Sequence, residues 1–239
     1  PALQYLSMAA QAALADNSPE AALKHFEEAI RIVTRKKAEM SRDPSGGESR
    51  QADAHGGYVS LEMLERVHGH VLQQSALCCI ATGEVHEGAV RLSLSLQVAA
   101  AEDRDLAKYS KLHLSWKCFQ MGLYLYLRRR LGRRFGVASA APPSEALQEA
   151  IDVVACSPLI EDQILTSFLT PRKRYWHRVA ATYEQLAVAL EELGATDTRA
   201  SLYCALRGAL LASDTPFLTP TLARCFATLS LIHTSHSTS

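Results

Sequence analysis

The chain has 239 residues, which suffices for one large domain or two small ones, and its 48% of apolar residues can fill a sizeable core. Lys and Arg together number 25, as do Asp and Glu, so the chain lacks the basic excess that is typical of a dedicated nucleic-acid-binding protein. No apolar run reaches the roughly 18 residues that a membrane helix needs, so we expect no transmembrane segment and a peripheral membrane contact at most.

Helices are predicted along nearly the whole chain, because apolar residues recur with a helical period and alternating β-branched runs are absent. Ser18, Pro19 and Glu20 form a typical helix start, whereas Gly83 and Gly194 stand where helices should stop. These signals predict an all-α protein. The predicted helices cover 2–16, 19–39, 60–81, 84–101, 104–132, 144–156, 158–169, 172–193, 197–213 and 219–234.

Two stretches interrupt this helical pattern. Polar residues and glycines without an apolar period fill 41–58, which predicts a disordered loop. The stretch GVASAAPP at 136–143 is a candidate boundary between an N-terminal helical domain, 1–136, and a C-terminal one, 144–239. Because the chain opens at Pro1 inside an apolar helical period, we also expect it to be a piece of a longer polypeptide.

A repeat is hidden in the helix pairs. In SPEAALKHFEEAI, the residues Ala22, Phe26 and Ala29 fall on one helical face, where small residues let a neighbouring helix approach and the aromatic ring fills the gap between them. This is the second-helix pattern of a tetratricopeptide repeat. We therefore predict a tetratricopeptide-like α-solenoid of antiparallel helix pairs, in preference to another helical bundle. The first-helix positions of the same copy are Leu6, Ala10 and Ala13. Two further degenerate copies occupy Leu72, Ala76, Cys79, Gly83, Gly88 and Leu92, and then Tyr183, Ala187, Leu190, Gly194, Ala200 and Cys204.

The stretch KLHLSWKCFQMGLYLYLRRRLGRRFG at 111–136 joins an apolar, aromatic run to a cluster of arginines. The plainest interpretation is a solenoid helix with a buried apolar front and a solvated basic end, whose charges suit the negative helix C-terminus. The alternatives are contact with an acidic protein partner, attachment to anionic lipid or, least expected, contact with nucleic acid. We single out as candidate partner-binding residues Arg128, Arg129, Arg130, Arg133 and Arg134. An acidic partner becomes more favoured if the same face carries a second basic patch, made of Arg172, Lys173, Arg174 and Arg178.

Few residues could carry chemistry. His68 and His70 are two positions apart and point to different sides of a helix, so we expect no metal site. His113 and His177 are predicted to lie at the surface or its boundary. No phosphate-binding GxxxxGK[ST] motif and no GxSxG motif occurs, so we expect no catalytic residue and no cofactor. Scattered cysteines without a CxxC motif indicate buried, reduced thiols and a cytoplasmic location; they are Cys78, Cys79, Cys118, Cys156, Cys204 and Cys225.

The order of the helical segments resembles the tail of a known family. PALQYLSMAAQAALADNSPEAALKHFEEAI is similar to the start of the tetratricopeptide-like tail in the soluble adenylyl cyclase-like family. Members of that family combine class III adenylyl or guanylyl cyclase domains, or in some cases a protein kinase, with a STAND-type ATPase. RVHGHVLQQSALCCIATGEVHEGAVRLSLSL resembles the next repeat of the tail, and LRRRLGRRF resembles the basic-aromatic segment after it. RVAATYEQLAVALEELGATDTRASLYCALRGALLA, followed by TPTLARCFATLSLI, is similar to the later repeat pair.

The resemblance implies a regulatory or scaffolding segment, since the cyclase and ATPase chemistry of the family lies upstream of this tail. We therefore expect a non-catalytic, protein-interaction segment of a larger nucleotide-dependent signalling protein. Its partners would be other proteins or upstream domains of the same chain. The alternative is a self-standing tetratricopeptide-like adaptor that binds a peptide or an acidic partner; a peripheral membrane protein is less expected.

Overall fold

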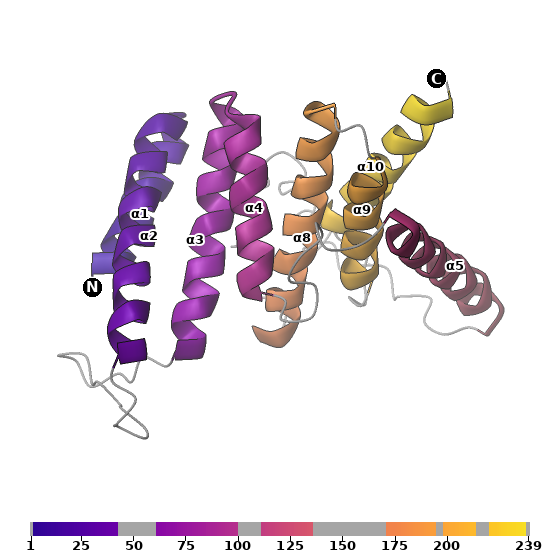
Figure 1. Cartoon of the computed structure of the whole chain (residues 1–239), viewed down its shortest axis with the longest axis horizontal. Coiled ribbons are helices and arrows are strands. Elements are labelled where there is room, and N and C mark those ends of the chain that lie inside the picture. The colour runs from indigo at the N-terminus through magenta and orange to yellow at the C-terminus, as the bar shows by residue number, and fades with distance from the viewer. Residues whose placement is uncertain are drawn as a thin grey trace, which may run out of the picture. The chain divides into compact units, whose positions relative to one another are not determined.

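The computed structural model describes residues 2–42, 61–99, 111–135, 171–194, 198–213 and 220–237. Within these ranges every regular element is an α-helix and no strand occurs, which confirms the all-α class. The chain divides into two compact units, the first from Pro1 to Arg104 and the second from Asp105 to Ser239 (Figure 1). The first unit holds α1 (Ala2–Ala15), α2 (Pro19–Arg42), α3 (Leu61–Ala81) and α4 (Val85–Ala99), and the second holds α5 (Lys111–Phe135), α8 (Pro171–Glu192), α9 (Thr198–Ala212) and α10 (Pro220–Ser237).

Some helix ends differ from the predicted ones. The α2 helix continues to Arg42, so the first two positions of the predicted loop 41–58 are helical. The hydroxyl of Ser41 donates to the Lys37 carbonyl at 2.9 Å, which adds a local contact to this last turn. The remainder of that loop lies outside the described residues. So do the predicted helices 144–156 and 158–169.

The division into units falls at a different place from the predicted domain boundary. The units meet in sequence at 104–105, whereas 136–143 lies outside the described residues. The α5 helix, which the sequence placed with the N-terminal helices, contacts α9 and so belongs to the second unit. This contact joins segments far apart in the chain, and the local signals of a sequence do not encode such contacts.

Both helix pairs of the first unit turn through the same three-residue connection. Asn17, with φ 56°, and Gly83, with φ 87°, hold the left-handed conformation that ends many helices. In each turn this residue donates its amide to the carbonyl three residues back at 3.0 Å, and the next residue donates to the carbonyl five residues back at 2.8 Å. Gly194 repeats the positive φ after α8 and donates its amide to the Glu191 carbonyl, three residues back, at 3.0 Å. Three helix ends therefore share a residue of positive φ whose amide bonds to the carbonyl three residues back.

The α3 and α4 helices approach closely because small residues face each other. A Cβ atom added to Gly88 would lie 2.6 Å from Cγ1 of Ile80 and 3.1 Å from the Ala76 carbonyl oxygen, so α4 can approach this closely because residue 88 has no side chain. Further from the turn, the buried hydroxyl of Ser95 donates to the Gly69 carbonyl at 2.7 Å. Small residues thus set the spacing of this pair along its length.

The positions predicted from the repeat lie inside. In the first copy Leu6 and Ala13 pack half-buried against a core formed by Ala10, Ala22, Phe26, Ala29, Val71 and Cys78. In the later copies the helical positions are buried, apart from two half-buried ones, Leu190 and Ala200. The fully buried members include Ala76, Cys79, Leu92, Tyr183, Ala187 and Cys204.

The second unit is held by similar close contacts among α8, α9 and α10. A Cβ atom on Gly208 of α9 would lie 3.0 Å from the Ala180 carbonyl oxygen of α8 and 3.1 Å from Sγ of Cys225 on α10. A buried carboxylate also crosses between helices, since Glu184 of α8 lies 3.5 Å from Nε of Arg224 on α10. The glycine in α9 and the ion pair between Glu184 and Arg224 therefore help to pack these three helices together.

Candidate interaction surface

One face of α5 packs on α9 in the second unit. Leu114 and Cys118 are buried, and Cys118 Sγ lies 3.8 Å from the carbonyl oxygen of Arg199 at the start of α9. Burial raises the pKa of Cys118 to about 11. Residues four apart share one helical face, so this inner face runs along α5 toward its C-terminal half.

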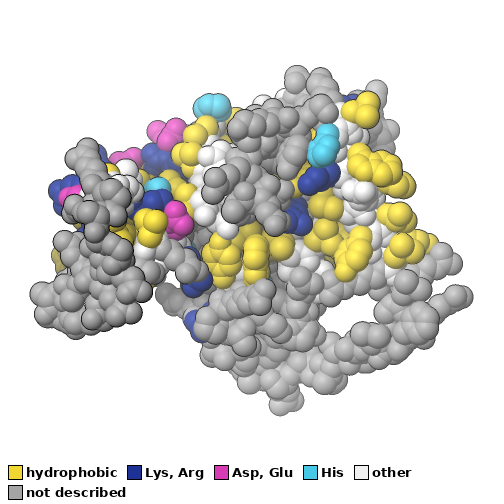
Figure 2. All heavy atoms as spheres, turned by 60° about the horizontal axis from the view of Figure 1, so that its bottom comes forward, with side chains coloured by type: hydrophobic (Ala, Val, Ile, Leu, Met, Phe, Trp, Pro, Cys, Tyr) yellow, Lys and Arg dark blue, Asp and Glu magenta, His cyan; other side chains and the backbone are white. Residues whose placement is uncertain are grey.

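The opposite face of α5 carries a second apolar series. Trp116 lies about 160° around the helix from Cys118, since each residue turns the chain by about 100°. Large apolar side chains recur there at alternating spacings of four and three residues, and each is 45–84% exposed. We call this series the outer stripe; it consists of Leu112, Trp116, Phe119, Leu123 and Tyr126. Hydrophobic side chains of the second unit gather at the right of Figure 2.

Two aromatic rings of the outer stripe are ordered against each other. The ring centroids of Trp116 and Phe119 lie 5.8 Å apart with 27° between the ring planes, while both side chains remain more than half exposed. Aromatic side chains offer a large apolar area with few rotatable bonds, which is why they concentrate at the centres of protein interfaces. The pair therefore forms a firm apolar platform on the surface.

The candidate partner-binding arginines lie on the last turns of the same helix. The backbone of α5 is helical through 128–135, while the side chains of Arg128, Arg129, Arg130, Arg133 and Arg134 lie outside the described residues. Positions 130 and 133 continue the four-and-three spacing of the outer stripe. The helix contains seven basic residues and no acidic one, so its apolar face ends in a cationic segment.

The predicted buried apolar front of this helix is therefore only half of its apolar surface. A helix that is apolar on all sides is normally enclosed by protein, but α5 buries one side and exposes the other. The signal was present in the sequence, because Leu114 and Cys118 follow one series and Trp116 and Phe119 another. The sequence could not show which series meets the rest of the chain.

The second basic patch lies at the start of α8, in the same unit. Arg174 and Arg178 are half-buried, while the side chains of Arg172 and Lys173 lie outside the described residues. The prediction for His177 was wrong, because this side chain is buried, while His113 is exposed as predicted. Ala180 and Ala181, which follow His177 by three and four residues on the same side of α8, are buried as well, and the local polarity of the sequence did not reveal this burial.

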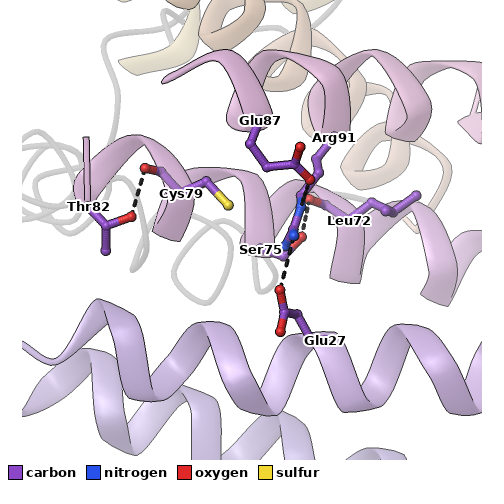
Figure 3. Close-up of polar contacts among 7 residues, drawn as sticks. All are labelled: Glu27, Leu72, Ser75, Cys79, Thr82, Glu87 and Arg91. Carbon is purple, nitrogen blue, oxygen red and sulfur yellow. Dashed lines mark hydrogen bonds and ion pairs between the residues drawn. The ribbon is translucent and has the colours of Figure 1, made fainter. Parts of the chain in front are cut away.

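The first unit contains an ion-pair cluster, drawn in Figure 3. Nη2 of Arg91 on α4 lies 3.0 Å from Oε1 of Glu27 on α2, and Nε of Arg91 lies 2.8 Å from Oε1 of Glu87. Burial disfavours the charge on Arg91, but hydrogen bonds to Glu87 and Glu27 outweigh burial and raise the pKa of Arg91. The cluster ties α4 to α2, and we assign it a structural role.

Three of the described thiols, those of Cys78, Cys79 and Cys118, are poorly suited to nucleophilic chemistry. Burial, followed by the neighbouring Cys79, raises the pKa of Cys78 to about 11. Burial also raises the pKa of Cys79, although the charge of Arg91 opposes this shift. A thiolate is the reactive form of cysteine, so at neutral pH these groups stay protonated.

The histidines of the HxH pair lie on α3 and bring no further ligands together. Within the described ranges, no group of three or more His, Cys, Asp or Glu side chains is arranged to hold a metal ion. Burial, then the positive charge of Lys37, lowers the pKa of His68, with Glu65 opposing them. Nδ1 of His68 is buried and has no hydrogen-bond partner in the described structure.

No helix among the described residues combines the length and the apolar character that crossing a membrane requires. Comparisons with protein-family models, with curated proteins and with solved structures found no match for the chain. The outer stripe of α5 with its basic end is therefore the feature on which a functional assignment can be built.

Proposed function

We propose that this chain is a non-catalytic protein-interaction segment that works within a larger nucleotide-dependent signalling protein of the cyclase–ATPase type. The observation that carries the proposal is the outer stripe of α5, an ordered apolar face on a helix that is already anchored through its other side. Exposed apolar patches rimmed by polar groups mark interaction sites on folded proteins.

The helix pairs support a tetratricopeptide-like scaffold for this surface. Each pair of the first unit turns through the same left-handed cap, and the small residues of the repeat pattern lie where two helices meet. In such arrays each pair buries its inner face against its neighbours and leaves other faces for partners. The parent architecture, with cyclase and ATPase domains upstream, rests on the ordered resemblance of the segments.

A site-specific cross-link tests the proposal. A photoreactive phenylalanine analogue replaces Phe119 on the outer stripe, and a matched variant carries it at Tyr124, which is similarly exposed but lies off the stripe. In extract of the source cells, we expect one protein adduct from position 119 and none from 124, with the partner identified by mass spectrometry and the cross-link reproduced with purified components.

Two results would contradict the proposed function. Absence of any protein adduct at position 119, with the variant folded, would remove the interaction role. Turnover of ATP by the purified chain alone would remove the non-catalytic assignment. A partner that is an upstream domain of the same polypeptide would favour the regulatory segment, and a separate protein would favour the adaptor alternative.

A further inference from the structure

We propose that the outer stripe of α5 docks an amphipathic helix of a partner protein whose flanking residues are acidic. This inference rests on the proposed function and names the chemistry of the partner. Three observations support it: the spacing of the exposed apolar residues, the stacked aromatic pair, and the positive charge of α5.

The spacing favours a helix as the occupant. The outer stripe follows a four-and-three alternation from Leu112 to Tyr126, which spans about 21 Å at 1.5 Å per residue. A seam with this period matches the apolar seam of a second helix, because both return to the same face every seven residues. A helix laid into an apolar surface through such anchors is a recurring mode of peptide recognition.

The charge favours an acidic partner. The α5 helix, which bears the outer stripe, carries seven basic residues and no acidic one. These positive charges attract a partner that has Glu or Asp beside its apolar seam, and they repel a basic partner.

The positions beside the outer stripe show where the charges would meet. The flanking positions in the first half of the stripe are His113, Ser115, Gln120 and Gly122, and none of them is a lysine or an arginine. Further along the helix, the flanking positions are Leu127, Arg129 and Arg134. The partner helix would therefore make mainly apolar contacts along the first half of α5, and its acidic residues would matter most beside the arginines.

A designed peptide tests this chemistry with the full chain. The probe is a 21-residue helical peptide with Leu at alternating spacings of four and three, Glu beside each Leu and Ala elsewhere. A matched peptide has Lys in place of Glu. The chain carries Trp176→Phe, so that Trp116 is its single tryptophan, and both the Trp116 emission and the anisotropy of a labelled peptide are recorded.

We expect the acidic peptide to bind saturably at one peptide per chain and to shift the Trp116 emission to shorter wavelength. The Lys peptide should bind at least about tenfold more weakly at low salt, since rim charges act strongly there and are screened as salt rises. Binding that is equal for both peptides would overturn the acidic assignment.

Two adjacent substitutions give the matched control. Leu123→Glu places a charge in the outer stripe, whereas Tyr124→Glu places the same charge about 100° away on the helix; the two side chains are 45% and 54% exposed. We expect Leu123→Glu to weaken acidic-peptide binding at least about tenfold and Tyr124→Glu less than about threefold. Equal losses, with both variants folded by circular dichroism, would contradict docking on the stripe.

Other occupants of the stripe have their own outcomes. The Trp116 emission is also recorded with vesicles of phosphatidylcholine and phosphatidylserine. If the vesicles shift it and the acidic peptide does not, the stripe binds a membrane surface and not a partner helix. If the Trp116 emission of the chain without peptide is already at short wavelength and depends on protein concentration, a second copy covers the stripe. If it is at short wavelength at every concentration, the chain itself covers the stripe. Either result overturns the proposal. If the peptide fails while the cross-link from position 119 succeeds, the interaction role stands and only the partner's chemistry is wrong.

Discussion

Two glycines of the second unit differ in what surrounds them, and the same substitution should change stability in opposite directions. Gly122 of α5 has no atom within 4 Å of an added Cβ, so Gly122→Ala should stabilise the protein by up to about 1 kcal/mol through helix propensity. Gly208 of α9 lies against Ala180 and Cys225, so Gly208→Ala should destabilise it by about 1–3 kcal/mol through overpacking.

The denaturation midpoint in urea measures both glycine effects. Because each change adds one methyl group to a helix of the same unit, the pair separates backbone propensity from the contact between helices. A stabilising effect of Gly208→Ala would mean that α9 can move away from α8 and α10 at little cost.

His68 makes the stability of the first unit depend on pH. Burial, the charge of Lys37 and the opposing charge of Glu65 leave the pKa of His68 below its ordinary value of 6.5. The unfolded chain therefore binds the proton first as the pH falls, and the free energy of unfolding decreases below about pH 6.5 until folded His68 is itself protonated. Above that pH both states are neutral at this residue and it makes no contribution.

Urea titrations at pH 7.5, 6.5 and 5.5 measure the contribution of His68. The decrease between pH 6.5 and 5.5 should be smaller in His68→Gln than in the unsubstituted chain, and the difference between the two chains isolates this residue from the other eight histidines. Parallel pH profiles for the two chains would show that folding does not lower the pKa of His68, and they would contradict this prediction.

At the scale of the elements, Arg91 of α4 pairs with two carboxylates, and only one of them belongs to another helix. Glu27 joins α4 to α2 through Arg91, whereas Glu87 pairs with Arg91 within α4. Glu27→Gln should therefore destabilise the first unit by about 1 kcal/mol, since it weakens a contact between helices made by a mostly buried guanidinium. Glu87→Gln should cost only about 0.2–0.5 kcal/mol, the range typical of pairs four residues apart on helices.

The same urea midpoints, measured in low and high salt, compare these two carboxylates. Both losses should shrink as salt rises, because each carboxylate is partly exposed. A larger loss for Glu87→Gln would mean that the pair within α4, and not the link to α2, holds the guanidinium in place.

The sequence predicted the elements of this fold better than their assembly. Helix ends follow local rules, so Gly83 and Gly194 were recognised as stops and are confirmed by their positive φ. Asn17 closes α1 in the same way but was not singled out, because asparagine holds this conformation less often than glycine. The face that α5 buries depends on its contact with α9, which no local pattern encodes.

The candidate site was predicted in part for the same reason. The arginines at the end of α5 were singled out by composition alone. The exposed platform of Trp116 and Phe119 was not recognised, because the exposed and buried series of this helix are equally apolar. Exposure belongs to the assembled unit and not to the helix itself.

At the scale of the whole molecule, the first unit should fold without the second. Its core joins Ala10, Phe26 and Val71 with their neighbours, and every member of that cluster lies before residue 79. A unit that closes its own core can fold alone, so we expect the fragment 1–104 to be helical and to unfold cooperatively in urea. Circular dichroism measures both properties.

Gly88→Val supplies the test of whether the isolated first unit keeps its packing. The valine side chain would collide with Ile80 and with the backbone at Ala76. The free energy of unfolding should therefore fall by about 1–3 kcal/mol, which is typical of an overpacked core. We expect the same loss in the fragment and in the full chain. A fragment that is helical but insensitive to this change would be a collapsed state without fixed packing. The contact between α3 and α4 would then need the second unit, and the two units would not be independent.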